Sequence, residues 1–326
     1  MTVKQAGFNL VELMISMVIG LVLMVSITTM FVDTKVSANR SSTVSSLQQQ
    51  ALLALQILVD DVRSIGSWAE FSGVSLDDIT LPVLTAPAGS CSLIPAIGST
   101  TSANRHKPKT ANWIRNSSAG PNLVLSVANC LDAEYSIATN SDVLSIARLQ
   151  GTITAQGDID TASYYVAVSP LQAQIFKGDT PNGATNIDDA DIYPYLHHTY
   201  IVQAHGSEGT RLSRFSYIDG DFVNDLVVDN IEQIRIDFGV DANSDGRPES
   251  YLVSSRITDL MWRTNQIVSA RIYVLARAKN KDLTLNNNAT FNDKFSPFNP
   301  PDDDNYRRFL LSTTVLINNN MMVAAQ

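Results

Sequence analysis

An uncharged, apolar run near the N-terminus constrains this chain more than any other feature. From Leu13 to Val32 the sequence LMISMVIGLVLMVSITTMFV contains no charged residue, and about 20 such residues suffice to cross a bilayer as a helix. A single carboxylate, Glu12, directly precedes the run. A carboxylate at mid-bilayer costs roughly 2.5 to 3.5 kcal/mol on insertion scales. The sequence therefore predicts a membrane helix in which Glu12 needs a partner of opposite charge.

A signal peptide and a generic signal anchor are two simpler explanations of the run. A secretory signal peptide has an apolar core of roughly 7 to 15 residues, followed by a cleavage site of small residues. Here the run is longer, and the segment FVDTKVSANR at its end holds no such site. A generic signal anchor fits the length, but it explains neither Glu12 nor the pair Gly7-Phe8 that precedes it.

Gly7-Phe8, with Glu12 as the fifth residue counted from Phe8, resembles the N-terminus of type IV pilins and their pseudopilin relatives. The resemblance implies that a prepilin peptidase cuts between Gly7 and Phe8 and methylates the new amine. That cationic amine would pair with Glu12, since two charges that are costly alone in a low dielectric become tolerable together. The chain departs from the usual motif at Asn9, where threonine is commonest. It also lacks the proline that kinks many major-pilin helices.

The helical pattern continues past the apolar run. No glycine or proline intervenes between Gly20 and Gly66, which favours one helix from near Phe8 to about Ser64, roughly 85 Å long at 1.5 Å per residue. Its second part carries an apolar stripe in steps of three and four residues, typical of one buried helix face. The residues of this stripe are Val36, Val44, Leu47, Ala51, Leu55, Leu58 and Val62.

We predict four segments: a leader at 1–7, a transmembrane and assembly helix at 8–32, its amphipathic continuation at 33–65, and a β-rich head at 66–326. The head sequence alternates apolar and polar residues in several runs, as half-buried strands require. The predicted strands are 122–128, 142–149, 163–168, 198–204, 211–218, 231–239, 250–255, 267–277 and 308–318. The expected fold class is α+β, with a long N-terminal helix packed against a large antiparallel sheet, as in pilins.

The charge balance argues against a nucleic-acid partner. The formal net charge is −9 and the sequence pI is about 4.9, whereas nucleic-acid binding leaves a footprint of clustered lysine and arginine. The chain also shows no nucleophile motif, phosphate-binding glycine loop or zinc signature. We therefore expect no enzyme activity and keep a membrane-anchored periplasmic hydrolase as a remote alternative.

The head sequence holds two cysteines, Cys91 and Cys130. A region that follows an N-terminal membrane segment with its basic end inside should face the oxidising periplasm. A disulfide between them would close a loop of about 40 residues and contribute about 4 kcal/mol in the chain-entropy model. Two free structural thiols are the alternative.

A run of oxygen-bearing side chains gives one candidate metal site. Asp241, Asn243, Asp245 and Glu249 occupy positions one, three, five and nine of a loop with Gly246 at position six. This is the first half of an EF-hand-type loop for Ca²⁺, but the twelfth position, normally a bidentate glutamate, is Leu252. The alternative is a polar hairpin loop, where aspartate, asparagine and glycine favour turn geometry. No other cofactor is expected.

Two further groups of titratable residues do not indicate a site. His197 and His198 are adjacent, so on a strand they would point to opposite faces and would not share a metal. The acidic run ending at Asp304, followed by Arg307 and Arg308, reads as a solvated loop that enters the last strand.

The C-terminal segments DNIEQIRIDFGVDANSDGRPESY, IVSARIYVLARA and YRRFLLSTTVLINN resemble the PilW group of minor pilins and the J-type pseudopilins of type II secretion. The resemblance implies a minor pilin held in the inner membrane with a periplasmic head, later placed at or near the fibre tip. Its partners would be other minor pilins, the major pilin, the prepilin peptidase, the assembly platform and membrane lipid. A tip pseudopilin of type II secretion is the alternative.

Overall fold

The structure is a computed structural model of the whole chain. It describes residues 9–70 except 66 and 68, residues 109–111, and residues 135–317 with gaps at 139–140, 171–172, 180–186, 207–208, 219–220, 254–255, 259–260, 262–263, 265, 283–284, 286–290 and 292–303. The chain forms two compact units, Met1–Ser46 and Leu47–Gln326. These two units are defined by their internal contacts, whereas the four segments predicted from the sequence are defined by their expected surroundings, such as membrane or periplasm.

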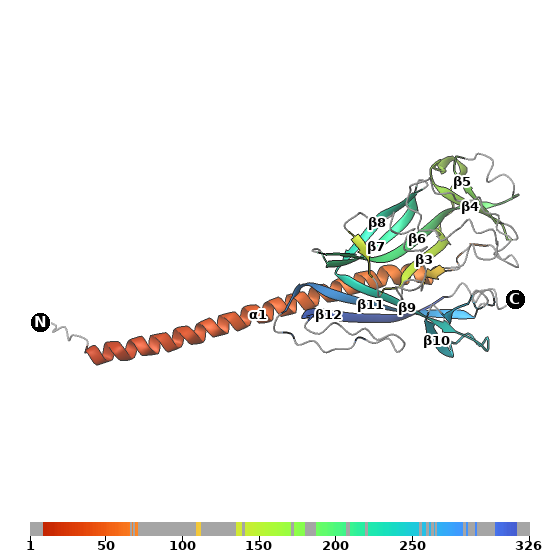
Figure 1. Cartoon of the computed structure of the whole chain (residues 1–326). Helices are drawn as coiled ribbons and strands as arrows, with labels where there is room; N and C mark the ends of the chain where they lie inside the picture. Colours follow the sequence, from red (N-terminus) through yellow and green to blue (C-terminus); the bar gives the residue numbers. More distant parts are fainter. Residues whose placement is uncertain are drawn as a thin grey trace, which may run out of the picture. The chain divides into compact units, whose positions relative to one another are not determined.

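One helix, α1, runs from Leu10 to Arg63 and is drawn in red to orange in Figure 1. In the first unit its residues are exposed nearly throughout, and its most apolar 18-residue window has no buried residue. By length and composition α1 could cross a membrane. The hydroxyls of Ser26 and Thr34 donate to the carbonyls of Val22 and Met30, at 2.9 and 2.7 Å. These hydroxyls therefore need no other partner in an apolar surrounding.

The head is built from antiparallel strands in two sheets (Figure 1). The large sheet has the order β1-β3-β6-β4-β5, with β2 and β7 also paired to β6 and β8 paired to β7. Its strands are β1 (Lys109–Ala111), β2 (Tyr135–Ile137), β3 (Val143–Leu149), β4 (Tyr164–Val168), β5 (Ala173–Lys177), β6 (Asp191–His205), β7 (Gly209–Ile218) and β8 (Asp221–Asp229).

The small sheet has the order β10-β9-β11-β12. Its strands are β9 (Ile231–Val240), β10 (Ser250–Val253), β11 (Ile267–Lys281) and β12 (Tyr306–Leu316), and a short 3-10 helix, η4, lies at Gln156–Asp158. The predicted alternation is visible across this sheet. Ala270, Ile272 and Val274 of β11 lie opposite Phe238, Ile236 and Ile234 of β9, and all six are buried.

The core of the head lies where the last part of α1 meets both sheets. Leu47, Ala51, Leu55, Leu58 and Val62 are buried in one cluster with apolar residues of β3, β6, β7, β9 and β11. These five residues belong to the stripe seen in the sequence. Burying a leucine side chain contributes roughly 1.5 to 3 kcal/mol, so this face of α1 is fixed to the head by the same residues that complete its core.

The strands predicted from the sequence match most, but not all, of the strands in the structure. Seven of its strand ranges overlap β3, β4, β6, β7, β9, β11 and β12, and an eighth overlaps β10. The predicted ranges leave out β1, β2, β5 and β8. The predicted strand at 122–128, both cysteines, Gly7 and Phe8 lie outside the described residues.

Candidate assembly site and its support in the head

Glu12 lies in the first turn of α1, with an exposed side chain. The helix is already hydrogen bonded there, since Leu13 N donates to Asn9 O at 3.2 Å. A carboxylate in the first turn is favoured by the unpaired N–H groups of the helix end. The structure therefore presents Glu12 at an open helix start, while its predicted partner, the amine of Phe8, lies outside the described residues.

At the other end of α1, Asp61 is buried in a polar cluster. Its Oδ1 accepts from Arg148 Nε at 3.1 Å and Arg148 Nη2 at 2.9 Å. Its Oδ2 accepts from Tyr200 Oη at 2.5 Å and contacts His198 Nδ1 at 2.6 Å. Asp61 is 4% exposed, so these contacts satisfy a carboxylate that water barely reaches.

The strands place all three partners on the helix-facing side. In the β3–β6 pair, Leu144 lies opposite Tyr200 and Ile146 lies opposite His198, and both are core residues. Alternate residues of a strand share a face, so Arg148, His198 and Tyr200 all point toward α1. The cluster therefore fixes the end of α1 to β3 and β6 in one register.

The charges around Asp61 hold it ionised. Burial alone raises the pKa of Asp61, but the hydrogen bond and charge of His198, the hydrogen bond of Tyr200 and the charge of Arg148 outweigh it and lower the pKa to about 2. Burial and the Asp61 charge raise the pKa of Tyr200 well above its usual range. Tyr200 therefore remains a neutral donor.

Sequence reasoning missed this cluster, although a signal was present. Asp61 lies three residues after Leu58 and one before Val62, so it falls within the apolar stripe of α1. A carboxylate at such a position indicates a buried partner. The separate faces predicted for His197 and His198 agree with the structure, where His198 contacts Asp61 and the His197 ring lies edge-on to Tyr195.

The opposite side of α1 in the head is open. Leu52 is 58% exposed and Leu53 is 52% exposed, and Gln48, Gln49 and Gln56 beside them are exposed as well. Among the described residues of α1 in the head, Leu52 and Leu53 are the large apolar side chains that are exposed.

The prediction of a solvated loop at Asp304 and Arg308 was wrong. The Arg308 side chain is 0% exposed and binds two carboxylates. It donates to Glu232 at 2.6 and 3.0 Å and to Asp304 at 2.7 and 2.8 Å. Burial lowers the pKa of Arg308, but the hydrogen bonds to Asp304 and Glu232 outweigh this effect and raise it above its usual range.

The neighbouring arginine makes a different link. Arg307 donates to Asp282 at 2.9 and 2.6 Å, and Asp282 N donates to Asn305 O at 2.8 Å. These bonds tie the end of β11 to the start of β12. Asp282 and Arg307 lie 25 positions apart in the sequence, so the local pattern around Arg307 gave no sign of this pairing.

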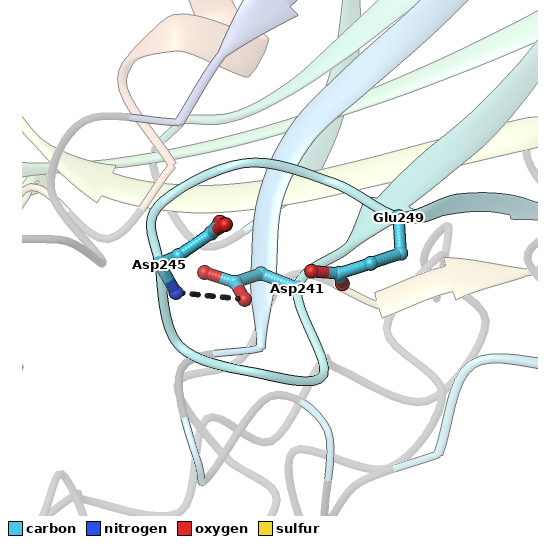
Figure 2. A group of neighbouring side chains, drawn as sticks. All are labelled: Asp241, Asp245 and Glu249. Atoms are coloured by element: carbon cyan, nitrogen blue, oxygen red, sulfur yellow. Dashed lines mark hydrogen bonds between the residues drawn. The ribbon is translucent and has the colours of Figure 1, made fainter.

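The predicted calcium loop connects β9 and β10. Figure 2 shows Asp241, Asp245 and Glu249 facing one another, and one ligand atom from each lies within 4.8 Å of the others. Asp241 accepts from the amides of Ser244, Asp245 and Gly246 at 2.6, 3.2 and 2.7 Å.

Other bonds complete the loop. Asn243 Oδ1 accepts from Asp245 N at 2.9 Å, and Glu249 Oε2 accepts from Ala242 N at 2.7 Å. Leu252 lies in β10, opposite Phe238. The hairpin reading accounts for these bonds, and calcium binding by the four residues stays a prediction.

Comparisons with known proteins were made against families, curated proteins and solved structures. Residues 3–28 match the model of the prokaryotic N-terminal methylation motif, and residues 199–319 match that of type IV pilus-assembly protein W. The chain is a type IV pilin-like protein. The matched methylation motif includes Gly7, Phe8 and Glu12. The region that matches pilus-assembly protein W includes strands β7 to β12. The resemblances to the type IV pilin N-terminus and to the PilW group are confirmed.

The other two comparisons add little detail. A solved type IV-like pilin from Thermus thermophilus matches with 10% identity and a TM-score of 0.27, covering 55% of this chain and 78% of that one. The search of curated proteins found no match. The family of this pilin-like protein is structural rather than enzymatic, and its motif and apolar helix indicate a membrane anchor that undergoes prepilin processing.

Proposed function

We propose that this protein is a minor pilin that helps to start a type IV pilus in the inner membrane and then occupies a place at or near its tip. The observation that carries the proposal is the position of Glu12, which lies at the start of an exposed apolar helix within a matched methylation motif. A carboxylate there is costly in lipid until a cation of a neighbouring subunit pairs with it.

The contrast between the two parts of α1 supports an assembly role. From Leu10 to Ser46 the helix buries almost nothing, whereas from Leu47 onward one face is buried in the head. The exposed Leu52 and Leu53 extend the open side of α1 into the head. In the proposed fibre, this side contacts the helices of neighbouring subunits, and before assembly the first part lies in lipid.

The size of the head supports a position at the tip. The second compact unit spans Leu47–Gln326, and a head of this size is hard to repeat at every step of a thin fibre. At the tip no subunit lies above it. Its partners there would be other minor pilins and the major pilin, and in the membrane the prepilin peptidase and the assembly platform, with the head in the periplasm.

A tip pseudopilin of type II secretion is the second candidate, because the same N-terminal motif serves both machines. Deleting the gene and measuring surface pili against exoprotein release separates them. Loss of pili with normal secretion is expected. Loss of secretion with normal pili would assign the protein to the secretion system instead.

The processing step is tested on the protein itself. Intact-mass and N-terminal analysis of the membrane-extracted chain should show an N-methylated Phe8 at the start. A chain that retains Met1, or one that begins after residue 32, would contradict the proposal.

A further inference from the structure

Strand β12 is one edge of the small sheet. Among the described residues it pairs with β11 alone, and the register runs without a break from Arg277↔Arg308 to Ser269↔Leu316. The outer edge of β12 therefore presents backbone N–H and C=O groups that no described strand takes up. Such an edge is a ready template for another extended chain.

The composition of β12 leaves this edge unprotected. From Phe309 to Leu316 the sequence is FLLSTTVL, without charge or proline. Natural sheet edges are commonly protected by lysine or other charges, by proline, or by a bulge that twists the edge away. None of these occurs in that stretch of β12.

The edge of the large sheet at β8 is protected. Its register with β7 is interrupted by a bulge between Arg214 and Phe215, and its sequence, DFVNDLVVD, carries three aspartates. The β8 edge is therefore protected, whereas no described strand covers the β12 edge, which suggests that β12 is kept for pairing.

We infer that β12 receives an extended, uncharged segment of a different fibre subunit as an added strand. In this binding mode the backbone gives affinity and alternate side chains give selectivity. Ser312, Thr314 and Leu316 are exposed on one face, and they would lie beside the side chains of the added strand. The side chains of Phe309 to Leu316 themselves offer a charged partner strand no counter-ion. The inference rests on the proposed function, because it takes the partner from the same fibre.

A second copy of this chain does not fit the edge. Two copies of β12 pairing antiparallel would be related by a twofold axis perpendicular to the sheet. The part of α1 from Leu47 to Arg63 packs on the sheet face, so the axis would reverse its direction in the second copy. In this part the helices of the two copies would then run in opposite directions, whereas the proposed fibre needs its subunits to point the same way.

Photocrosslinking in cells that assemble fibres tests the inference. A photoreactive phenylalanine analogue replaces Leu316 on β12, Leu53 on α1, or Thr152 in an exposed loop as the control. We expect adducts with another subunit at positions 316 and 53, and none at 152. The partner peptide captured at 316 should be an uncharged segment.

The second part of the experiment places charged residues on the edge of β12. Ser312→Lys with Thr314→Lys should lower the adduct at 316 by about tenfold, because a strand added there would face two unpaired charges. It should leave the adduct at 53 unchanged. The matched control is Gln150→Lys with Thr152→Lys, two exposed positions outside the sheets, and it should change neither adduct.

The outcomes separate the two proposals. Adducts at 53 without any at 316, an adduct at 316 that the two lysines do not weaken, or an adduct of this chain with itself would each overturn the added strand and leave the minor-pilin function standing. Absence of adducts at both positions would contradict the proposed function as well.

Discussion

His198 and Tyr200, two residues apart on β6, both reach the same carboxylate oxygen of Asp61, at 2.6 and 2.5 Å. Arg148 takes the other oxygen. The helix α1, which by length and composition could cross a membrane, is thus held in the head by an ionised group. Directional bonds fix rotation and translation of α1 together, whereas apolar packing alone tolerates small shifts.

Removing the Asp61 charge should destabilise the head strongly. Asp61→Asn leaves Arg148, whose side chain is 20% exposed, without its counter-ion, and breaking a largely buried pair in this way costs about 3 kcal/mol. Thermal unfolding of the full chain in detergent measures the loss. Asp60→Asn is the matched control, since Asp60 is exposed on the same helix turn, and an equal effect of both changes would contradict the role of the cluster.

The cluster around Asp61 predicts how the stability of the head falls at low pH. The pKa of Asp61 falls from 3.8 to about 2 on folding, so its contribution to stability is fully present above pH 4 and is lost as the pH falls through 2. At about 1.4 kcal/mol per pKa unit the contribution is about 2 kcal/mol. Unfolding measured from pH 5 to pH 2 should show this slope in the native chain and a smaller slope in Asp61→Asn.

Adjacent arginines on β12 should differ in importance. Arg308→Met leaves Asp304 without the cation that it binds and leaves Glu232 with Arg277 alone, and we expect a loss of about 3 kcal/mol. Arg307→Met breaks a pair whose side chains are 24% and 21% exposed, and it should cost about 1 kcal/mol or less. Urea unfolding of both variants provides the comparison. An equal loss of unfolding free energy in the two variants would mean that burial of Arg308 does not strengthen its ion pairs.

Glu12 should be needed for assembly but not for processing. Glu12→Ala removes the carboxylate that pairs with the Phe8 amine, and it leaves Gly7 and Phe8 intact. We expect normal N-terminal cleavage by mass analysis and few surface pili by electron microscopy. Normal piliation in this variant would sink the pairing hypothesis.

Calcium binding by the β9–β10 loop is tested by calorimetric titration of the chelator-treated chain. The prediction is a weak site, because the loop lacks the bidentate glutamate of a full EF-hand. Asp245→Asn removes one exposed ligand and should abolish the binding heat, while unfolding without calcium stays unchanged. No binding heat in the native chain would leave Asp241 as a hairpin residue only.

The sequence predicted those parts of the molecule in which a single periodicity decides the structure. The stripe from Leu47 to Val62 and the alternation in β9 and β11 each identify one element by itself. Strand β8 was missed because its aspartates lower the apparent strand preference, although pairing with β7 overrides it. Asp61 and Arg308 were missed for a different reason. Their partners lie far away along the chain, and periodicity carries no information about partners.

The link between Asp282 and Arg307 has a consequence for how this chain can change. The two strands that flank the long β11–β12 connection are joined at its base by an ion pair and a backbone bond. Closing a longer loop adds entropy cost only with the logarithm of its length. Insertions between Asp282 and Arg307 should therefore lower the stability of the fold only slightly. Relatives can differ in length in this connection, and an epitope tag can be introduced there.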